Sequence, residues 1–141
     1  MGVVILIGRI LYALIFIGSG TAGHLMQTEG TAGYAESRGI PSSKLLTQLS
    51  GVLIFAGGLG VILGIWADLA ALGLVAYSLL AAFMVHHFWT DEDPMTQQVE
   101  MSMFMKNLSM AGGGLILFGF LAATGDGAGL MITDPLFDLD F

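Results

Sequence analysis

Three histidines and a few charged and amide side chains are the groups of this sequence that can do chemistry. Two of the histidines are adjacent within residues 83–107, which read FMVHHFWTDEDPMTQQVEMSMFMKN, and His24 closes the first apolar run. Imidazoles ligate metals or haem, exchange protons near neutral pH and hydrogen-bond quinone carbonyls. The candidate polar or quinone site comprises His24, His86, His87, Trp89, Glu100, Lys106 and Asn107.

The adjacent histidines are not expected to act together. Consecutive helical positions are rotated by about 100°, so His86 and His87 cannot readily bind one metal while both are helical. One of them can face the bundle and pair with His24 or Glu100. The alternative is that all three are interfacial residues satisfied by water and lipid headgroups.

Two further patterns contain groups that bind metals, and neither predicts a metal site. The MxMxM run at residues 101–105 resembles a copper-thioether pattern, but its central methionine points away from the other two on a helix. The acidic turn at residues 91–93 offers oxygen ligands for a divalent cation, although a solvated turn is commoner. The chain has no cysteine, which excludes thiolate-ligated cofactors. The cofactor is therefore left unassigned, and electron transfer would need a quinone, another bound cofactor or a partner protein.

The composition is that of a membrane protein. Hydrophobic residues make up 55% of the 141 residues and charged residues only 11%, against about 25% charged residues in soluble domains. A net charge of −7 argues against a nucleic-acid partner, because such binding needs basic patches. The predicted partners are the lipid bilayer and other membrane subunits or further copies of the chain.

Four apolar runs are each close to the about 20 residues that span a bilayer as a helix. We predict an all-α transmembrane four-helix bundle with antiparallel, up-down-up-down topology, formed by residues 3–26, 45–65, 69–87 and 99–123. A signal peptide is the competing interpretation of the first run. It is disfavoured because no lysine or arginine precedes the apolar core.

The connections are short and contain turn and interface residues. Residues 32–38 are predicted to form a short surface helix that ends at Gly39. The break at residues 66–68 forces an antiparallel hairpin, and Asp68 is expected to cap the helix that follows. Trp66 and Trp89 bracket that helix as interfacial aromatic anchors.

An even number of spans places both termini on one side of the membrane and every candidate site residue near the other. The short loops on the site side carry Arg38 and Lys44, against Arg9 alone near the N-terminus. The positive-inside rule then favours a cytoplasmic location for the site side, by a margin of one or two charges.

Two basic residues lie inside predicted spans. An intramembrane arginine costs at least about 2.5 kcal/mol at the bilayer centre. We expect Arg9 to snorkel toward the headgroups, with pairing to an acid or a carbonyl inside the bundle as the alternative. Lys106 either pairs with Glu100 or Asp93 or snorkels in the same way.

The C-terminal segment differs from the rest of the chain. We divide the sequence into a four-helix domain at residues 1–124 and an acidic tail at residues 125–141. The tail is expected to be disordered in the free protein, with an edge strand or a docking peptide as alternatives. The residues predicted to dock a partner are Asp134, Asp138 and Asp140.

Several motifs resemble, in their order, the DoxX family of small four-helix bacterial and archaeal membrane proteins. They read GRILYALIFIGSGTAGH, GTAGYAESRGIP, GIWADLAAL, HHFW and FMKNLSMAGGGL, within residues 8–117. The resemblance implies a multi-pass protein of the bacterial inner membrane. It also implies a redox association, since the family is named after a subunit of a thiosulfate:quinone oxidoreductase and some relatives are linked to membrane oxidoreductase complexes and oxidative-stress handling.

Three functions follow as hypotheses. The first is a redox-associated, quinone-linked subunit of a membrane oxidoreductase complex. The second is a non-catalytic structural or accessory subunit that docks in a larger membrane assembly. A small-solute carrier or channel comes third, because a four-span protomer with so few intramembrane polar groups offers no pathway unless it oligomerises.

Overall fold

The computed structural model describes residues 2–139 and contains α-helices, two π-helical segments and short 3-10 turns. In chain order these elements are α1 (Gly2–Gly18), η1 (Ser19–Met26), α2 (Thr28–Ser37), α3 (Ser43–Leu63), α4 (Ala67–Leu80), η2 (Ala81–Val85), η3 (Phe88–Thr90), α5 (Pro94–Thr124) and η4 (Gly125–Ala128).

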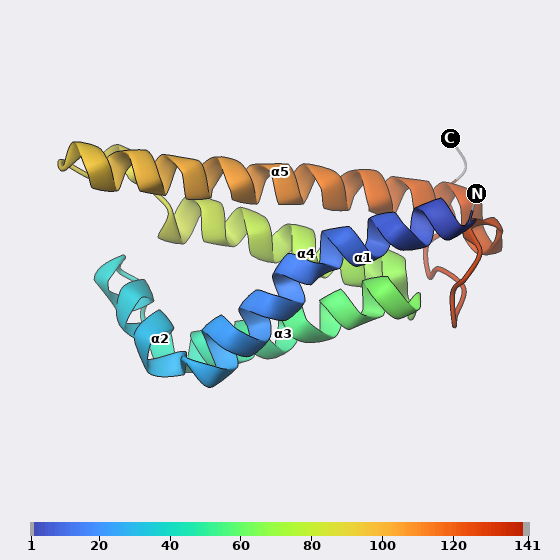
Figure 1. Ribbon diagram of the computed structural model, residues 1–141, viewed down its shortest axis with the longest axis horizontal. Helices are drawn as coiled ribbons and strands as arrows, with labels where there is room; N and C mark the ends of the chain where they lie inside the picture. Colours follow the sequence, from blue (N-terminus) through green and yellow to red (C-terminus); the bar gives the residue numbers. More distant parts are fainter. Residues whose placement is uncertain (1, 140–141) are drawn as a thin grey trace.

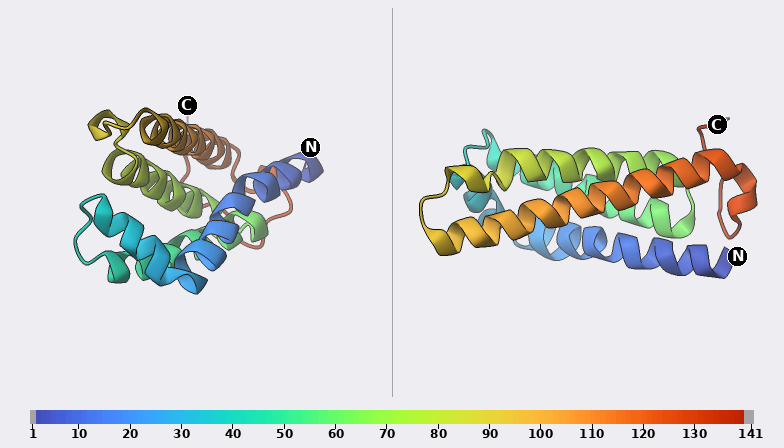
Figure 2. Two further views of the ribbon diagram at one scale, coloured as in Figure 1. Left: turned by 60° about the vertical axis from the view of Figure 1, so that its left-hand side comes forward. Right: turned by 90° about the horizontal axis from the view of Figure 1, so that it is seen from above.

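The four predicted spans are confirmed. The helices long and apolar enough to cross a membrane in the described chain are Gly2–Met26, Ser43–Leu63, Ala67–Thr90 and Pro94–Ala128. α1 packs on α3, α3 on α4 and α4 on α5, and the start of α1 lies at the same end of the bundle as the segment that follows α5 (Figures 1 and 2). The Tyr12 hydroxyl donates to the Met110 carbonyl at 3.2 Å and connects α1 to α5.

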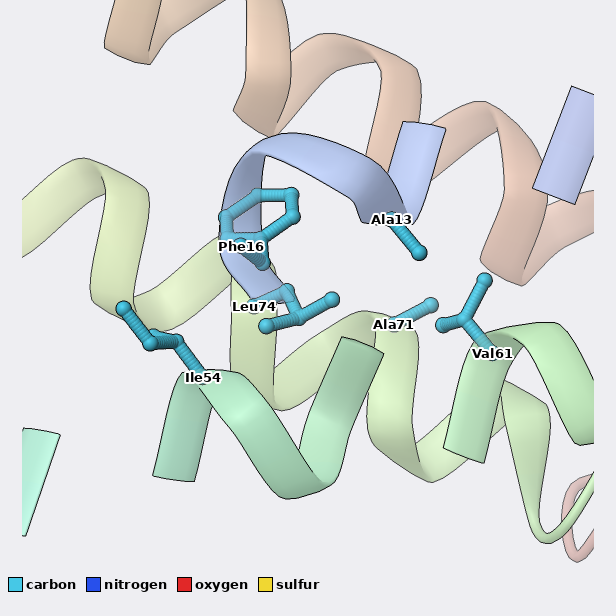
Figure 3. Close-up of a cluster of buried hydrophobic side chains, with 6 residues drawn as sticks. All are labelled: Ala13, Phe16, Ile54, Val61, Ala71 and Leu74. Carbon is cyan, nitrogen blue, oxygen red and sulfur yellow. The ribbon is translucent and has the colours of Figure 1, made fainter. Parts of the chain in front are cut away.

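The core is narrow and lies where three helices meet. Figure 3 shows its buried side chains, which are Ala13, Phe16, Ile54, Val61, Ala71 and Leu74. Many other large apolar side chains face outward, such as Ile116, which is 76% exposed. An apolar outer surface is stable when lipid covers it, so the packing agrees with a bundle embedded in a bilayer.

The last span begins earlier than predicted. α5 starts at Pro94 rather than near residue 99, because the Asp93 carboxylate accepts the backbone N–H of Thr96 at 2.8 Å and proline occupies the first turn. Its 31 residues correspond to about 46 Å of helix, against about 30 Å of hydrocarbon. The first turns of α5 therefore extend beyond the hydrocarbon layer and carry polar residues.

The first loop and the C-terminal end of the third span also differ in detail from the prediction. The predicted surface helix is present as α2, which begins four residues earlier and is followed by Gly39 at a φ of +86°. The third span ends its helical geometry at Val85, so His86 leaves the helix with φ −96° and ψ 43°. Two spans thus finish in a π-helical segment at the same end of the bundle, a feature that often accompanies functional sites.

Arg9 does not snorkel, so that expectation is wrong and the carbonyl alternative holds. Its side chain is 1% exposed, and Nη2 donates to the carbonyls of Ile62 at 3.0 Å and Leu130 at 2.6 Å. The last turn of a helix leaves carbonyls without intrahelical partners, and α3 presents one of them here. Arg9 is consequently a structural contact between α1, α3 and the C-terminal segment.

The C-terminal segment is ordered, so the expectation of a disordered tail is wrong. Residues 129–139 form no regular element, but the N–H groups of Ile132 and Thr133 donate to the Gly64 carbonyl at 3.1 and 3.0 Å. Gly64 has a φ of +69°, and a Cβ added there would lie 2.6 Å from Met131. The turn between α3 and α4 therefore needs glycine to admit the tail.

Asp68 was expected to cap α4 and instead holds the tail. It lies in the first turn of α4 and is fully buried, but its Oδ2 accepts the backbone N–H groups of Leu136 and Phe137, both at 2.7 Å. Asp134 and Asp138 lie exposed on this fixed segment, whereas Asp140 lies outside the described residues.

Candidate functional site

A cavity of about 370 Å³ lies at the end of the bundle away from the termini, where α2, η1, α3, α4 and η2 meet. Its volume falls in the range of small-molecule sites. Most of its wall is apolar, and its titratable and hydroxyl-bearing side chains include His24, Tyr34, Ser50, Tyr77 and His86. Leu46, Leu80 and Met84 line the cavity and are also exposed on the apolar outer surface of the bundle. The cavity therefore has a border that lipid can reach.

His24 forms a fixed part of the wall. Its Nδ1 lies 2.9 Å from the Ser50 hydroxyl, which itself donates to the Thr47 carbonyl at 3.0 Å and so accepts from the ring. Its Nε2 lies 3.3 Å from the Tyr77 hydroxyl. A Cβ at Gly51 would approach the His24 Cβ to 2.6 Å, so glycine permits η1 to pack this closely on α3.

His86 has a different environment. Its Nδ1 lies 2.8 Å from Oε2 of Glu100, and Oε1 of the same carboxylate accepts the Tyr34 hydroxyl. Of the two partners considered for the adjacent histidines, His24 and Glu100, it is Glu100 that His86 contacts. Within residues 2–139, Nε2 of His86 has no hydrogen-bond partner, and His86 lines the cavity.

A second cavity of about 180 Å³ adjoins the first. The residues that line both cavities form a partition between them, and they are His24, Tyr77, Ala81 and His86. The second cavity is completed on the α1 and α5 side by residues that include Ser19, Lys106 and Asn107. Lys106 is exposed and its ammonium contacts the Met103 sulfur at 3.3 Å, with no carboxylate within ion-pair distance in the part of the chain that the structure describes. The acid partner considered for Lys106 is therefore absent from its surroundings.

Arg38 ties α2 to the segment that follows the third span. Its Nη1 and Nη2 donate to the two carboxylate oxygens of Asp91 at 2.7 and 3.2 Å, and Nε donates to the Val85 carbonyl at 2.7 Å. The hydrogen bond from Arg38 holds the pKa of Asp91 below its usual value, and the same bond raises the pKa of Arg38. The acidic turn is thus a bidentate anchor for α2.

His87 and Trp89 of the predicted set lie outside both cavities, and Glu100 lines neither of them. His87 contacts the Thr90 hydroxyl at 2.7 Å and the Arg38 carbonyl at 3.2 Å. Trp89 packs edge-on against Phe88 and Phe104, with ring centroids 5.4 and 5.8 Å apart. Of the others, His24 and His86 line both cavities, Lys106 and Asn107 line the second, and Glu100 lies behind His86.

Sequence reasoning missed Tyr34, Tyr77 and the pairing of Arg38 with Asp91. Tyr34 and Arg38 are four residues apart on a helix that was itself predicted, so they share a face, and that signal was available. Tyr77 lies four residues before Ala81, another residue of the partition between the cavities. No spacing in the sequence would have identified Ser50.

Comparisons with known proteins agree with this architecture. A family model described as DoxX matches residues 4–87, which include both cavity histidines but not Glu100 or Lys106. Inner membrane protein YqjF of Escherichia coli K12 is 36% identical over 124 residues, covering 88% of this chain and 85% of the relative. Inner membrane protein YphA of the same organism is 34% identical over 126 residues, covering 89% and 86%. No solved structure matches. With its four spans and these relatives, the chain belongs to the DoxX family and is a multi-pass protein of the bacterial inner membrane.

Proposed function

We propose that this protein is the quinone-binding, redox-linked subunit of a membrane oxidoreductase complex, with the quinone head group in the larger cavity. The observation that carries the proposal is the combination of apolar walls, a border at the lipid surface and an imidazole nitrogen without a protein partner. A quinone needs these three features, since its ring is apolar, its isoprenoid tail lies in lipid and its carbonyls accept hydrogen bonds.

The polar groups of the cavity suit the two oxygens of such a ring. His86 offers Nε2 to one oxygen, and the Tyr77 hydroxyl, which donates to His24 Nε2, can accept a hydrogen bond from the O–H of the reduced ring. The sequence has no cysteine, so a cysteine-ligated cluster in this chain cannot supply the electrons. A redox-active partner subunit, such as a haem-bearing protein, supplies them, and this is why we assign the chain as a subunit.

Filling the cavity tests the proposal. Ala81 lines both cavities, and Ala81→Phe should weaken binding of a short-chain ubiquinone to the purified protein in nanodiscs by about tenfold or more. Ala123→Phe is the matched control, because Ala123 is exposed near the other end of α5 and should leave binding unchanged. Titration calorimetry measures both, and a wild-type protein that binds no quinone would refute the proposal.

A structural accessory subunit remains the alternative, supported by Asp134 and Asp138, which lie exposed on an ordered tail. That function predicts that deleting residues 134–141 releases the partner complex during mild-detergent purification. It also predicts that Ala81→Phe leaves the activity of the complex intact. The quinone proposal predicts loss of activity with Ala81→Phe, so the two variants separate the hypotheses.

A further inference from the structure

The hydrogen-bond chain from Tyr34 through Glu100 to His86 determines which nitrogen of His86 is available to a ligand. We propose that Glu100 is a positioning residue that keeps a proton on Nδ1 of His86, so that proton exchange takes place at Nε2, which donates to a bound quinone when the ring is an imidazolium and accepts from a quinol when the ring is neutral. This inference rests on the proposed function, and it adds the residue that controls proton exchange at that site.

The carboxylate of Glu100 is surrounded by donors. The residue is 6% exposed, Oε1 accepts the Tyr34 hydroxyl and Oε2 lies 2.8 Å from His86 Nδ1. Burial, together with the hydrogen bond to Glu100, raises the pKa of Tyr34, so the phenol keeps its proton and remains a donor. An ionised carboxylate only accepts hydrogen bonds, and Nδ1 must therefore carry the proton at this contact.

The other two histidines cannot take this role. Both ring nitrogens of His24 contact protein groups, Ser50 at Nδ1 and Tyr77 at Nε2. Both ring nitrogens of His87 also have partners, and His87 lines neither cavity. His86 thus combines a free ring nitrogen, within the described residues, with a place in both cavity walls.

The proton and electron balance is simple. Reduction of a quinone to a quinol takes two electrons, supplied by the redox-active partner subunit, and two protons. An imidazolium at His86 breaks its Nε2–H bond as the quinone oxygen forms its O–H bond. The neutral ring then regains a proton from the bulk solution, relayed by a water molecule that is itself left unchanged. The second cavity can hold that water, since one molecule occupies about 30 Å³ and Ser19, Lys106 and Asn107 offer polar contacts. A second such transfer completes the quinol.

Several other titratable groups surround His86 and enter any pH dependence. The groups packed around it are Glu100 and Lys106 on α5, Tyr34 on α2, Arg38 directly after α2, His24 on η1 and Tyr77 on α4. The pH dependence of binding therefore reports on several groups together. The effect of a substitution on His86 alone is measured by observing the protonation of its ring nitrogens.

Nitrogen NMR of the histidine rings reads the tautomer directly. The chain has three histidines, so ¹⁵N-histidine labelling in nanodiscs gives a small set of signals, and a His86→Asn sample assigns those of His86. At a pH where the spectrum shows neutral rings, wild type should carry the proton on Nδ1. In Glu100→Gln the new amide can donate to Nδ1, so the proton should move to Nε2. Glu92→Gln, at an exposed acid in the turn before α5, should leave the spectrum unchanged.

Quinone binding supplies the second readout. Glu100→Gln should weaken quinone binding about tenfold at mildly acidic pH and flatten its pH profile, because the imidazolium loses its carboxylate partner. Glu100→Asp should partly restore the pH profile of quinone binding. The same measurement can be made with Glu100→Asp if Glu100→Gln does not fold.

The outcomes distinguish the two proposals. A wild-type protein that binds no quinone refutes the proposed function, whatever the tautomer. A wild-type protein that binds quinone, with an unaltered His86 tautomer and pH profile in Glu100→Gln, refutes only the role of Glu100. A wild-type His86 with its proton on Nε2 also refutes that role.

Discussion

The two ends of the bundle use buried charge in different ways. At the end that holds the termini, Arg9 and Asp68 are buried and each binds backbone groups of the C-terminal segment. At the other end, Arg38 pairs with Asp91, 53 residues away, and Glu100 pairs with His86, 14 residues away. The charges at the first end hold the C-terminal segment against the bundle. At the second end, Glu100 holds His86, which lines the cavity and whose Nε2 has no partner within the described residues.

The comparison indicates which property a substitution at each end of the bundle should change. The contacts of Asp68 and Arg9 involve no side-chain partner, so their loss is felt as stability. Glu100 contacts His86 in the cavity wall, so under the proposed function its loss should also change quinone binding, whereas Arg38 joins α2 to the segment after the third span. Variants at the two ends should therefore separate into two classes.

The largest effect on stability is expected at Asp68. Asp68→Ala leaves the N–H groups of Leu136 and Phe137 without their acceptor, which should lower the free energy of unfolding by about 3 kcal/mol. Limited proteolysis of the tail and thermal melting in detergent micelles measure this loss. Asp134→Asn, at an exposed position of the same segment, should change neither readout. If the tail is cleaved equally fast in the two variants, Asp68 does not hold the C-terminal segment in place.

Arg9 should give an intermediate effect that depends on the replacement. Two of its nitrogens, Nε and Nη1, are buried without partners within residues 2–139, which offsets part of what the two bonds from Nη2 contribute. Arg9→Met should cost about 1 kcal/mol or less, because a well-packed apolar side chain often replaces a buried charge at little cost. Arg9→Ala should cost about 2 kcal/mol through the cavity it leaves. Thermal melting of both variants measures these losses. If Arg9→Met lowers the free energy of unfolding more than Arg9→Ala does, the charge of Arg9 is itself required for stability.

The smallest effect concerns Arg38 and Asp91 and appears only in acid. The folded-state pKa of Asp91 is lowered, so the contribution of this pair is fully present above its unfolded pKa and is lost as pH falls through the folded value. The link between α2 and η3 should therefore weaken only below about pH 4. Spin labels at Ser37 and Glu92 would report this as a broadened distance distribution at low pH. Asp91→Asn should show the broad distribution at every pH, and a narrow one at neutral pH would exclude the anchor.

The sequence by itself determined the number of spans, the all-α class and the end of the bundle at which the polar residues gather. These properties depend on hydropathy and length along the chain, which are local and need no knowledge of packing. The capped start of α5 was also readable from Asp93 and Pro94, and it was missed because hydropathy alone was used to place the boundary. The assignment of quinone, partner and reaction stays a prediction.

Only the tertiary structure decided which polar groups meet. Tyr34 and Glu100 are 66 residues apart, Arg38 and Asp91 are 53 apart, and Asp68 reaches the tail over 68 residues. No periodicity encodes such distances, because each contact depends on how the helices cross and where the helical geometry of the third span ends. The tail is ordered for the same reason: its backbone donors find acceptors on residues that only the folded bundle brings beside it.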